Sequence, residues 1–248
     1  MTYEEMRADR FRDRDDAGLR LAERVREQAE RQEWPRPFVL ALPRGGVPVA
    51  AHVARALGAP LDVLVARKIG APGTPEVGIG AIVANDPPVW DERILRFLDI
   101  TADQLGAEVA HERTELNRRE ALYRHGRLAP DLRSRTVVLV DDGLATGVTV
   151  RAALRLIRRD APARVVVAVP VGDSRALAEL QEDVDQLVCL SQPADFRAVG
   201  LWYDDFTQVA DDEVVEILES RLRTGGVGRA PVGGPSPGPP VGGPGSPR

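Results

Sequence analysis

Two adjacent carboxylates and a turn of small residues give residues 137–150 the strongest chemical signal in the sequence. The stretch reads VVLVDDGLATGVTV, so a run of apolar residues leads directly into Asp141 and Asp142. Two neighbouring carboxylates repel each other unless hydroxyl donors or a cation separate them. A vicinal diol suits such a pair, and the pattern therefore favours a sugar as the ligand.

The residues that follow the pair favour a phosphate. Gly143 and residues 145–149 lead into a predicted helix, whose first backbone N–H groups and two threonine hydroxyls can hold an anion. The stretch lacks the lysine of a Walker A loop and the G-x-G-x-x-G pattern of a dinucleotide fold. A sugar phosphate would satisfy both halves of the motif, and an Asp-rich turn that only caps a helix is the alternative.

The motif VVLVDDGLATGVT closely resembles the signature with which type I phosphoribosyltransferases bind 5-phosphoribosyl-1-pyrophosphate (PRPP). The resemblance extends over most of residues 10–220. It implies that Asp141 and Asp142 bind the ribose hydroxyls and that residues 145–149 bind the 5′-phosphate. Carboxylates fixed beside the ribose would stabilise the positive charge that develops as pyrophosphate leaves, so Asp142 is also an expected catalytic residue.

A second glycine-containing loop, residues 43–46, follows the first apolar strand in the segment ALPRGGVPVA. Two glycines permit backbone conformations closed to other residues and can leave N–H groups open to an anion. The resemblance implies that this loop binds pyrophosphate and contains a non-proline cis peptide, which we expect between Arg44 and Gly45. A tight strand-to-helix turn is the alternative. The two loops together supply the expected PRPP ligands: Arg44, Gly45, Gly46, Asp141, Asp142, Gly143, Ala145, Thr146, Gly147, Val148 and Thr149.

A third loop is predicted over residues 66–82, where glycine and proline leave no regular period. Arg67 and Lys68, the only lysine of the chain, give it local positive charge. The segment resembles the flexible catalytic loop of the family, which closes to exclude water from a reactive ribosyl cation, and this implies catalytic roles for Arg67 and Lys68. Glu76 is an expected acid for a nucleobase nitrogen, by analogy with adenine-type members. For Lys68, an ordinary solvated charge is the alternative.

The acceptor is expected to meet a small hood containing the aromatic cluster of residues 194–209. Aromatic rings can stack on a planar base, although such clusters more often pack a core. Members that act on 6-oxopurines usually carry an Asp where this chain has Ala145, while the spacing of the cluster is similar to hypoxanthine-type hoods, so the base stays open. The expected base-binding residues are Phe196, Trp202, Tyr203 and Asp204.

Short β-branched runs alternate with helical patterns, which predicts an α/β fold with a mainly parallel central sheet flanked by helices. In such folds ligands bind at the carboxyl ends of the strands. The expected strands are residues 38–42, 61–66, 80–84, 136–140, 163–170 and 186–190, and the expected helices are residues 15–33, a segment after Gly46, residues 102–123 and a segment after Thr149.

Composition predicts one phosphoribosyltransferase-like domain, residues 1–223, with hood elements from both ends. Residues 224–248 are mostly Gly and Pro, which predicts a disordered tail. The single Cys189 predicts a buried thiol in a reducing, cytoplasmic setting, and no segment resembles a signal peptide or a membrane span. A net charge of −5 gives no global field for nucleic acid.

The combined pattern predicts an enzyme, a phosphoribosyltransferase of nucleotide salvage that joins the ribosyl carbon of PRPP to a nitrogen nucleophile, with a nucleobase as the expected acceptor. A non-catalytic PRPP sensor of the same fold is the alternative. Mg²⁺ is expected as cofactor, held by pyrophosphate and ribose oxygens without a protein cage, since His52, His111 and His125 show no ligand spacing. The expected partners are PRPP, a small acceptor and a second copy of the chain.

Overall fold

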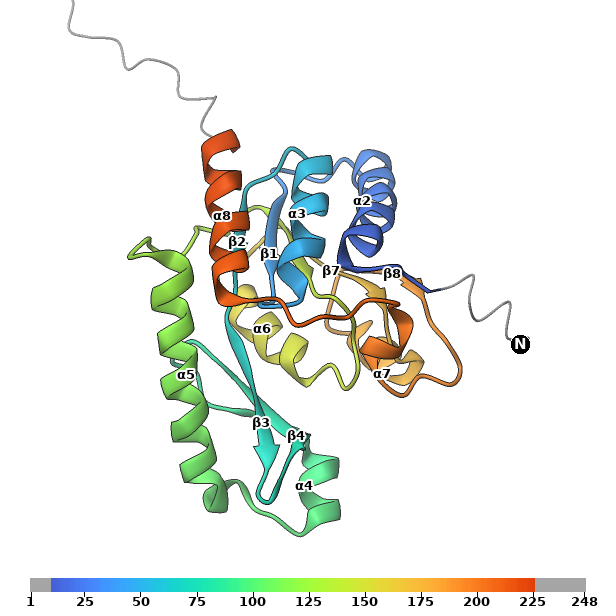
Figure 1. The fold of residues 1–248 in the computed structure, drawn as a ribbon. Helices are drawn as coiled ribbons and strands as arrows, with labels where there is room; N and C mark the ends of the chain where they lie inside the picture. Colours follow the sequence, from blue (N-terminus) through green and yellow to red (C-terminus); the bar gives the residue numbers. More distant parts are fainter. Residues whose placement is uncertain (1–9, 226–248) are drawn as a thin grey trace, which may run out of the picture.

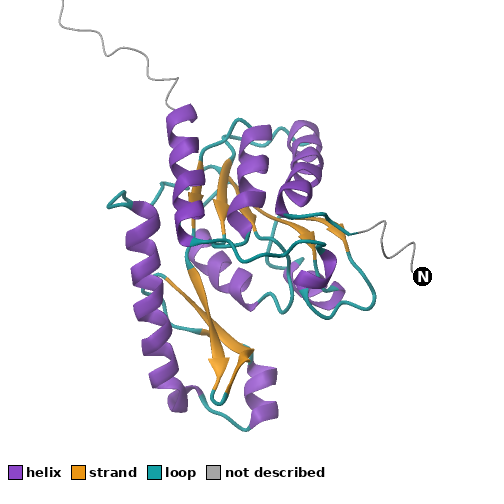
Figure 2. Ribbon diagram, in the orientation of Figure 1, coloured by secondary structure: helices purple, strands orange, loops and turns teal. Residues whose placement is uncertain are grey.

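A computed structural model describes residues 10–225, which form a larger body around one sheet and a smaller lobe around another (Figures 1 and 2). The larger sheet has five strands, all parallel, in the order β2-β1-β6-β7-β8. This confirms the predicted α/β class. The strands are β1 (Phe38–Ala41), β2 (Leu61–Val63), β6 (Thr136–Val140), β7 (Arg164–Val171) and β8 (Gln186–Ser191).

Both faces of this sheet are covered by helices, which explains why its strands are nearly continuous apolar runs. In β6, Val138 and Val140 pack into the core on one face, while Val137 and Leu139 belong to the core on the other. Helices α2 (Arg14–Arg31), α3 (Gly46–Ala56) and α8 (Asp211–Gly225) cover the first face, and α6 (Val148–Arg159) and α7 (Ser174–Leu180) cover the second.

The strand order brings the two sequence motifs together. β1 and β6 are neighbours and parallel, with Ala41 paired to Val140, so both strands end at the same edge of the sheet. The loop of residues 43–46 follows β1 and the Asp pair follows β6. The two loops that are expected to bind the ligand therefore meet at the carboxyl edge of the sheet.

The smaller lobe corrects the predicted loop of residues 66–82. This segment forms a hairpin of β3 (Ala66–Ala71) and β4 (Thr74–Val83), joined by the Pro72–Gly73 turn, in which Gly73 has a φ of +75°. A Pro-Gly pair suits such a turn because glycine tolerates the positive φ. The residues expected as a central strand, 80–84, lie largely in β4. β5 (Val89–Trp90), α4 (Glu92–Leu98), the 3-10 helix η1 (Ala102–Leu105) and α5 (Gly106–Arg124) complete the lobe.

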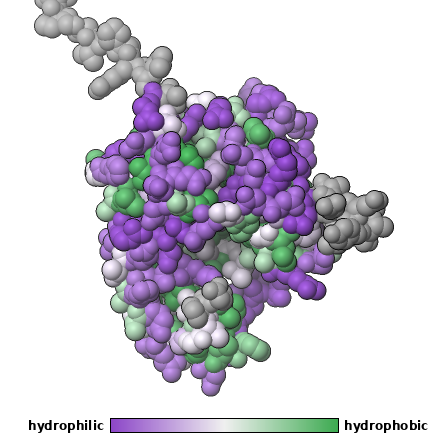
Figure 3. All heavy atoms as spheres, viewed as in Figure 1, coloured by the Kyte–Doolittle hydropathy of each residue, from purple (hydrophilic) through white to green (hydrophobic). Residues whose placement is uncertain are grey.

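Three further expectations concern the end of the domain, the single cysteine and membrane spans. Helix α8 continues to Gly225, two residues beyond the predicted end of the domain, and the rest of the predicted tail lies outside the described residues. Cys189 is half-buried instead of fully buried, and burial raises the pKa of its thiol to about 12. Within residues 10–225, none of the helices has the length and apolar character to cross a bilayer. The face drawn in Figure 3 is mostly hydrophilic, with smaller apolar patches.

Candidate active site

The Asp pair is fixed by backbone hydrogen bonds at the end of β6. The Asp141 N–H donates to the Ala168 carbonyl of β7 over 3.4 Å, and the Asp141 side chain accepts the N–H of Asp142 over 2.9 Å. Farther along the turn, Leu144 donates to Val171 and accepts from Asp173, over 2.9 and 2.8 Å. These hydrogen bonds hold the turn against the edge of the sheet.

The two carboxylates differ in their electrostatic surroundings. Burial and the charge of Asp142 raise the pKa of Asp141 well above its ordinary value. Burial also raises the pKa of Asp142, but the nearby Arg14 guanidinium opposes this rise. Of the two carboxylates, Asp142 is therefore the one that forms an ion pair with a cationic side chain.

Contacts from both ends of the chain hold Asp142. Nε and Nη2 of Arg14, the first residue of α2, each lie 2.8 Å from Asp142 Oδ2. The Tyr203 hydroxyl donates to the Asp142 carbonyl over 2.5 Å. Sequence reasoning missed Arg14, because a charge in an Arg- and Asp-rich segment gives no sign of a partner 128 residues away.

The glycines of the 43–46 loop have a steric role instead of the predicted conformational one. Gly45 has an ordinary φ of −59°, but a Cβ on it would lie 1.9 Å from Asp142 Oδ2. A Cβ on Gly46 would lie 2.8 Å from the Val140 carbonyl oxygen, and the Gly46 N–H donates to Leu42 instead of being open to an anion. The cis peptide joins Pro43 to Arg44, one bond earlier than expected.

Arg44 itself is directed toward helix α8, where its Nη1 lies 3.5 Å from Asp211 Oδ1. Asp211 also accepts hydrogen bonds from the Tyr123 hydroxyl over 2.5 Å and from Arg118 over 2.8 Å. No sequence signal marked this cluster, since its members come from three distant segments. It ties the loop after β1 to the long helix of the smaller lobe.

The turn of residues 145–149 has the form expected for a phosphate loop. Gly147 has a φ of +70°, which favours glycine, and α6 begins at the next residue. The Thr146 hydroxyl accepts the Val148 N–H at 3.5 Å, and Arg151 Nη2 donates to the Thr146 carbonyl over 2.9 Å. A helix N-terminus with a guanidinium behind it provides a favourable potential for an anion.

The predicted catalytic residues of the hairpin lie on the smaller lobe. Lys68 is exposed on β3, and its aliphatic stem lies across Gly78, since a Cβ there would come within 2.7 Å of Lys68 Cδ. Arg67 is paired with Glu112 of α5 at 2.7 Å. Glu76 belongs to the backbone of β4, but its side chain lies outside the described part of the structure.

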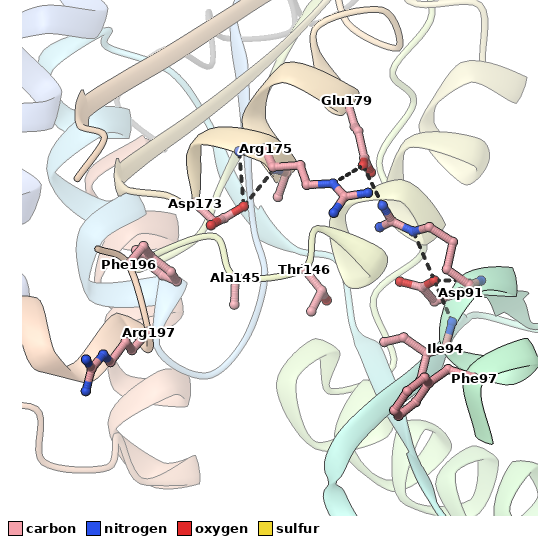
Figure 4. A pocket seen from close by; sticks show the side chains of 12 residues that line it. Asp91, Ile94, Phe97, Ala145, Thr146, Asp173, Arg175, Glu179, Phe196 and Arg197 are labelled. Atoms are coloured by element: carbon pink, nitrogen blue, oxygen red, sulfur yellow. Dashed lines mark hydrogen bonds and ion pairs between the residues drawn. The ribbon is translucent and has the colours of Figure 1, made fainter. Parts of the chain in front are cut away.

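A cavity of about 500 Å³ opens beside the turn of residues 145–149, between the two lobes (Figure 4). Ala145 and Thr146 lie between Phe196 on one side and Ile94 and Phe97 of α4 on the other. The sequence did not predict that α4 and α7 line this cavity, because their positions depend on how the folded chain packs. The remaining lining residues are Asp91, Arg93, Asp173, Arg175, Ala176, Glu179 and Arg197.

Of the four predicted base-binding residues, only Phe196 lines this cavity. Trp202 and Tyr203 are 5% and 2% exposed and pack with Phe11, so the core alternative is correct for both. Asp204 is exposed and lies 3.3 Å from Arg10. Because Trp202 and Tyr203 are buried, neither ring is open to stack on a base. Tyr203 instead stabilises the turn that contains Asp142.

Comparisons with known proteins show the family to which the chain belongs. Two curated relatives, from two strains of Mycobacterium tuberculosis and each named "Putative phosphoribosyl transferase", are 44% identical over 213 residues. The match covers 86% of this chain and 47% of each relative, so the chain spans about half their length. The crystal structure of TT1426 from Thermus thermophilus is 44% identical, with a TM-score of 0.68 over 85% of this chain and 98% of that one. The family described as "Phosphoribosyl transferase domain" matches residues 14–205, and the chain belongs to that family.

Proposed function

We propose that this protein binds PRPP at the carboxyl edge of its larger sheet and transfers the phosphoribosyl group to a nitrogen nucleophile, releasing pyrophosphate. The observation that carries the proposal is the position of the Asp pair. Asp141 and Asp142 lie between the 43–46 loop and the turn before α6, which ends in a helix N-terminus suited to a phosphate. PRPP fits this arrangement because its ribose diol lies between two anionic groups, the 5′-phosphate and the pyrophosphate.

The reaction requires stabilisation of positive charge on the ribose. As the bond from C1 to pyrophosphate breaks, the ribosyl ring becomes cationic, and a carboxylate held beside it lowers the energy of that state. Asp142 suits this role because Arg14 and Tyr203 hold it in place before the ligand binds. A preorganised charge needs little rearrangement during the reaction.

Mg²⁺ is the proposed cofactor and would arrive with the pyrophosphate oxygens of PRPP, whose negative charge it would partly neutralise. Within residues 10–225, no group of three or more His, Cys, Asp or Glu could hold a metal ion by itself. Asp141 and Asp142, next to the proposed phosphate sites, are compatible with a Mg²⁺ ion that is held mainly by PRPP and by water.

The cavity beside Ala145 is the proposed acceptor site. Phe196, Phe97 and Ile94 give it apolar walls suited to a planar ring, and its volume of about 500 Å³ lies within the range of small-molecule sites. A nucleobase is the proposed acceptor on these grounds. We place the reaction in the cytoplasm, because both PRPP and a nucleobase are expected there.

One observation favours the sensor alternative. The carboxylates in the cavity wall are already engaged: Asp91 and Asp173 cap α4 and α7, and Glu179 is paired with Arg93 at 2.9 Å. No described acid in this wall is therefore available to transfer a proton to a base. A protein that binds PRPP without turnover would have such a wall.

Pyrophosphate release distinguishes the two functions. The protein is incubated with PRPP, Mg²⁺ and a panel of purine and pyrimidine bases, and pyrophosphate is measured by a coupled assay. If the protein is a transferase, we expect pyrophosphate to be released only in the presence of one class of base. PRPP binding without release on any acceptor would support the sensor, and absence of PRPP binding would contradict both.

A further inference from the structure

A cationic side chain from a distant part of the sequence, Arg14 at the start of α2, contacts Asp142. Two nitrogens of Arg14 share one oxygen of Asp142, each at 2.8 Å. The side chains are only 11% and 14% exposed, so water screens this pair far less than a surface ion pair. Removal of one partner from such a pair leaves the other charge buried and uncompensated.

The guanidinium is itself fixed on its other sides. Nη1 of Arg14 donates to the Thr207 carbonyl over 2.7 Å, and the guanidinium carbon lies 3.9 Å from the centre of the Phe206 ring. Phe206 in turn packs against Tyr203, with ring centres 5.0 Å apart. Arg14 is therefore held in position by residues of the 194–209 segment, which was expected to bind the base.

The surrounding charges make Arg14 the cation that balances the Asp pair. The ionisable groups that face Asp142 are Arg14 from α2, Asp141 from the same turn and Tyr203 from the segment after η2 (Val199–Trp202). Arg44 is paired with Asp211 instead. Among these neighbours Arg14 is the one whose positive charge favours the ionised form of Asp142.

We propose that Arg14 is a positioning residue, which holds the Asp142 carboxylate in the orientation that the ribosyl group meets. The inference rests on the proposed function, because it assigns Asp142 to the ribose of PRPP. It adds a residue outside the PRPP motif and explains why the turn after β6 is braced by both ends of the domain. Arg14 does not touch the reacting atoms in this account; it acts through Asp142.

The test measures PRPP affinity by calorimetry in the presence of Mg²⁺ for the full chain and its variants. Arg14→Ala is expected to weaken binding about ten- to a hundredfold at pH 7, the scale of a displaced active-site group. Part of this loss should be recovered as pH rises, because Asp142 without Arg14 keeps its proton to higher pH. Arg14→Lys should retain more affinity than Arg14→Ala, since it keeps the charge but loses the two-nitrogen contact.

Two controls separate positioning from general damage. Arg24→Ala removes an arginine of the same helix that is 54% exposed and paired at 3.7 Å with Glu27, and it should bind PRPP like the wild type. In the Asp142→Asn background, adding Arg14→Ala should cause little further loss, because the residue that Arg14 positions is already altered. If Arg14→Ala unfolds, Arg14→Gln can replace it, because glutamine keeps a polar side chain of similar length. Arg14→Gln is also expected to weaken PRPP binding.

The outcomes distinguish this inference from the proposed function. A wild type that binds PRPP, together with Arg14→Ala and Arg14→Gln variants of unchanged affinity, would overturn the positioning role and leave the proposed function intact. A full additive loss in the Asp142→Asn background would also overturn it. A wild type that binds no PRPP would contradict both.

Discussion

Replacement of Gly45 by alanine tests the contact between the two ligand loops. A Cβ at this position would lie 1.9 Å from Asp142 Oδ2 and 2.6 Å from Cγ of the same carboxylate, far inside any normal contact distance. The φ of Gly45 is ordinary, so the effect of the substitution comes from the methyl group and not from backbone strain. Either the carboxylate or the 43–46 loop must move.

The expected magnitude follows from that overlap. Overpacking of a well-packed site costs about 1–3 kcal/mol of folding free energy, and a chain of this size loses about 2–4 °C in Tm per kcal/mol. Displacement of Asp142 by about 1 Å should in addition weaken PRPP binding or turnover by about a hundredfold. Thermal unfolding and calorimetry with PRPP and Mg²⁺ measure the two effects separately.

Gly106→Ala is the matched control, because Gly106 is exposed, has an ordinary φ of −61° and would place its Cβ in open space. This variant should keep PRPP affinity and leave Tm unchanged or slightly higher. If Gly45→Ala kept both the Tm and the PRPP affinity of the wild type, the close approach of the two loops would be refuted.

Three further predictions concern single side chains. Because the pKa of Asp141 is raised in the folded protein, the contribution of this carboxyl group to stability falls as pH rises above about 4. Asp141→Asn should therefore raise Tm at pH 7 and raise it less near pH 4. An equal change in Tm at both pH values would contradict burial and the charge of Asp142 as the cause. Tyr123→Phe should lower the free energy of unfolding by about 1.5 kcal/mol in urea titrations, because it removes the hydrogen bond to the Asp211 carboxylate, and an unchanged midpoint would show that this bond adds nothing. Lys68→Ala should lower kcat by about ten- to a thousandfold with a smaller change in PRPP affinity, and an unchanged kcat would return Lys68 to the status of a solvated charge.

The sequence was sufficient to predict features that depend on local pattern. Continuous apolar runs predicted the strands of the parallel sheet, and the residues around Asp141 and Asp142 predicted the turn at the end of β6. These features were accessible because burial on both faces and a helix N-terminus leave signals within a short stretch of sequence.

One local hairpin and several long-range contacts could not be predicted from the sequence. The hairpin of β3 and β4 was interpreted as a loop, because its glycines and the Pro72–Gly73 turn obscure the period of two. The pairing of Arg14 with Asp142 and the burial of Tyr203 depend on segments that meet only in the folded chain. Periodicity carries no information about such partners.

Calorimetry of the Asp141→Asn, Asp142→Asn double variant tests whether the Asp pair binds the ribose of PRPP. Both asparagines keep the shape of the side chains but remove their charges and weaken their acceptor capacity. Thermal unfolding and circular dichroism establish that the variant is folded. We expect the wild type to bind PRPP with Mg²⁺ and the folded double variant to bind it at least about tenfold more weakly. Wild-type affinity in a folded double variant would contradict ribose binding by the Asp pair.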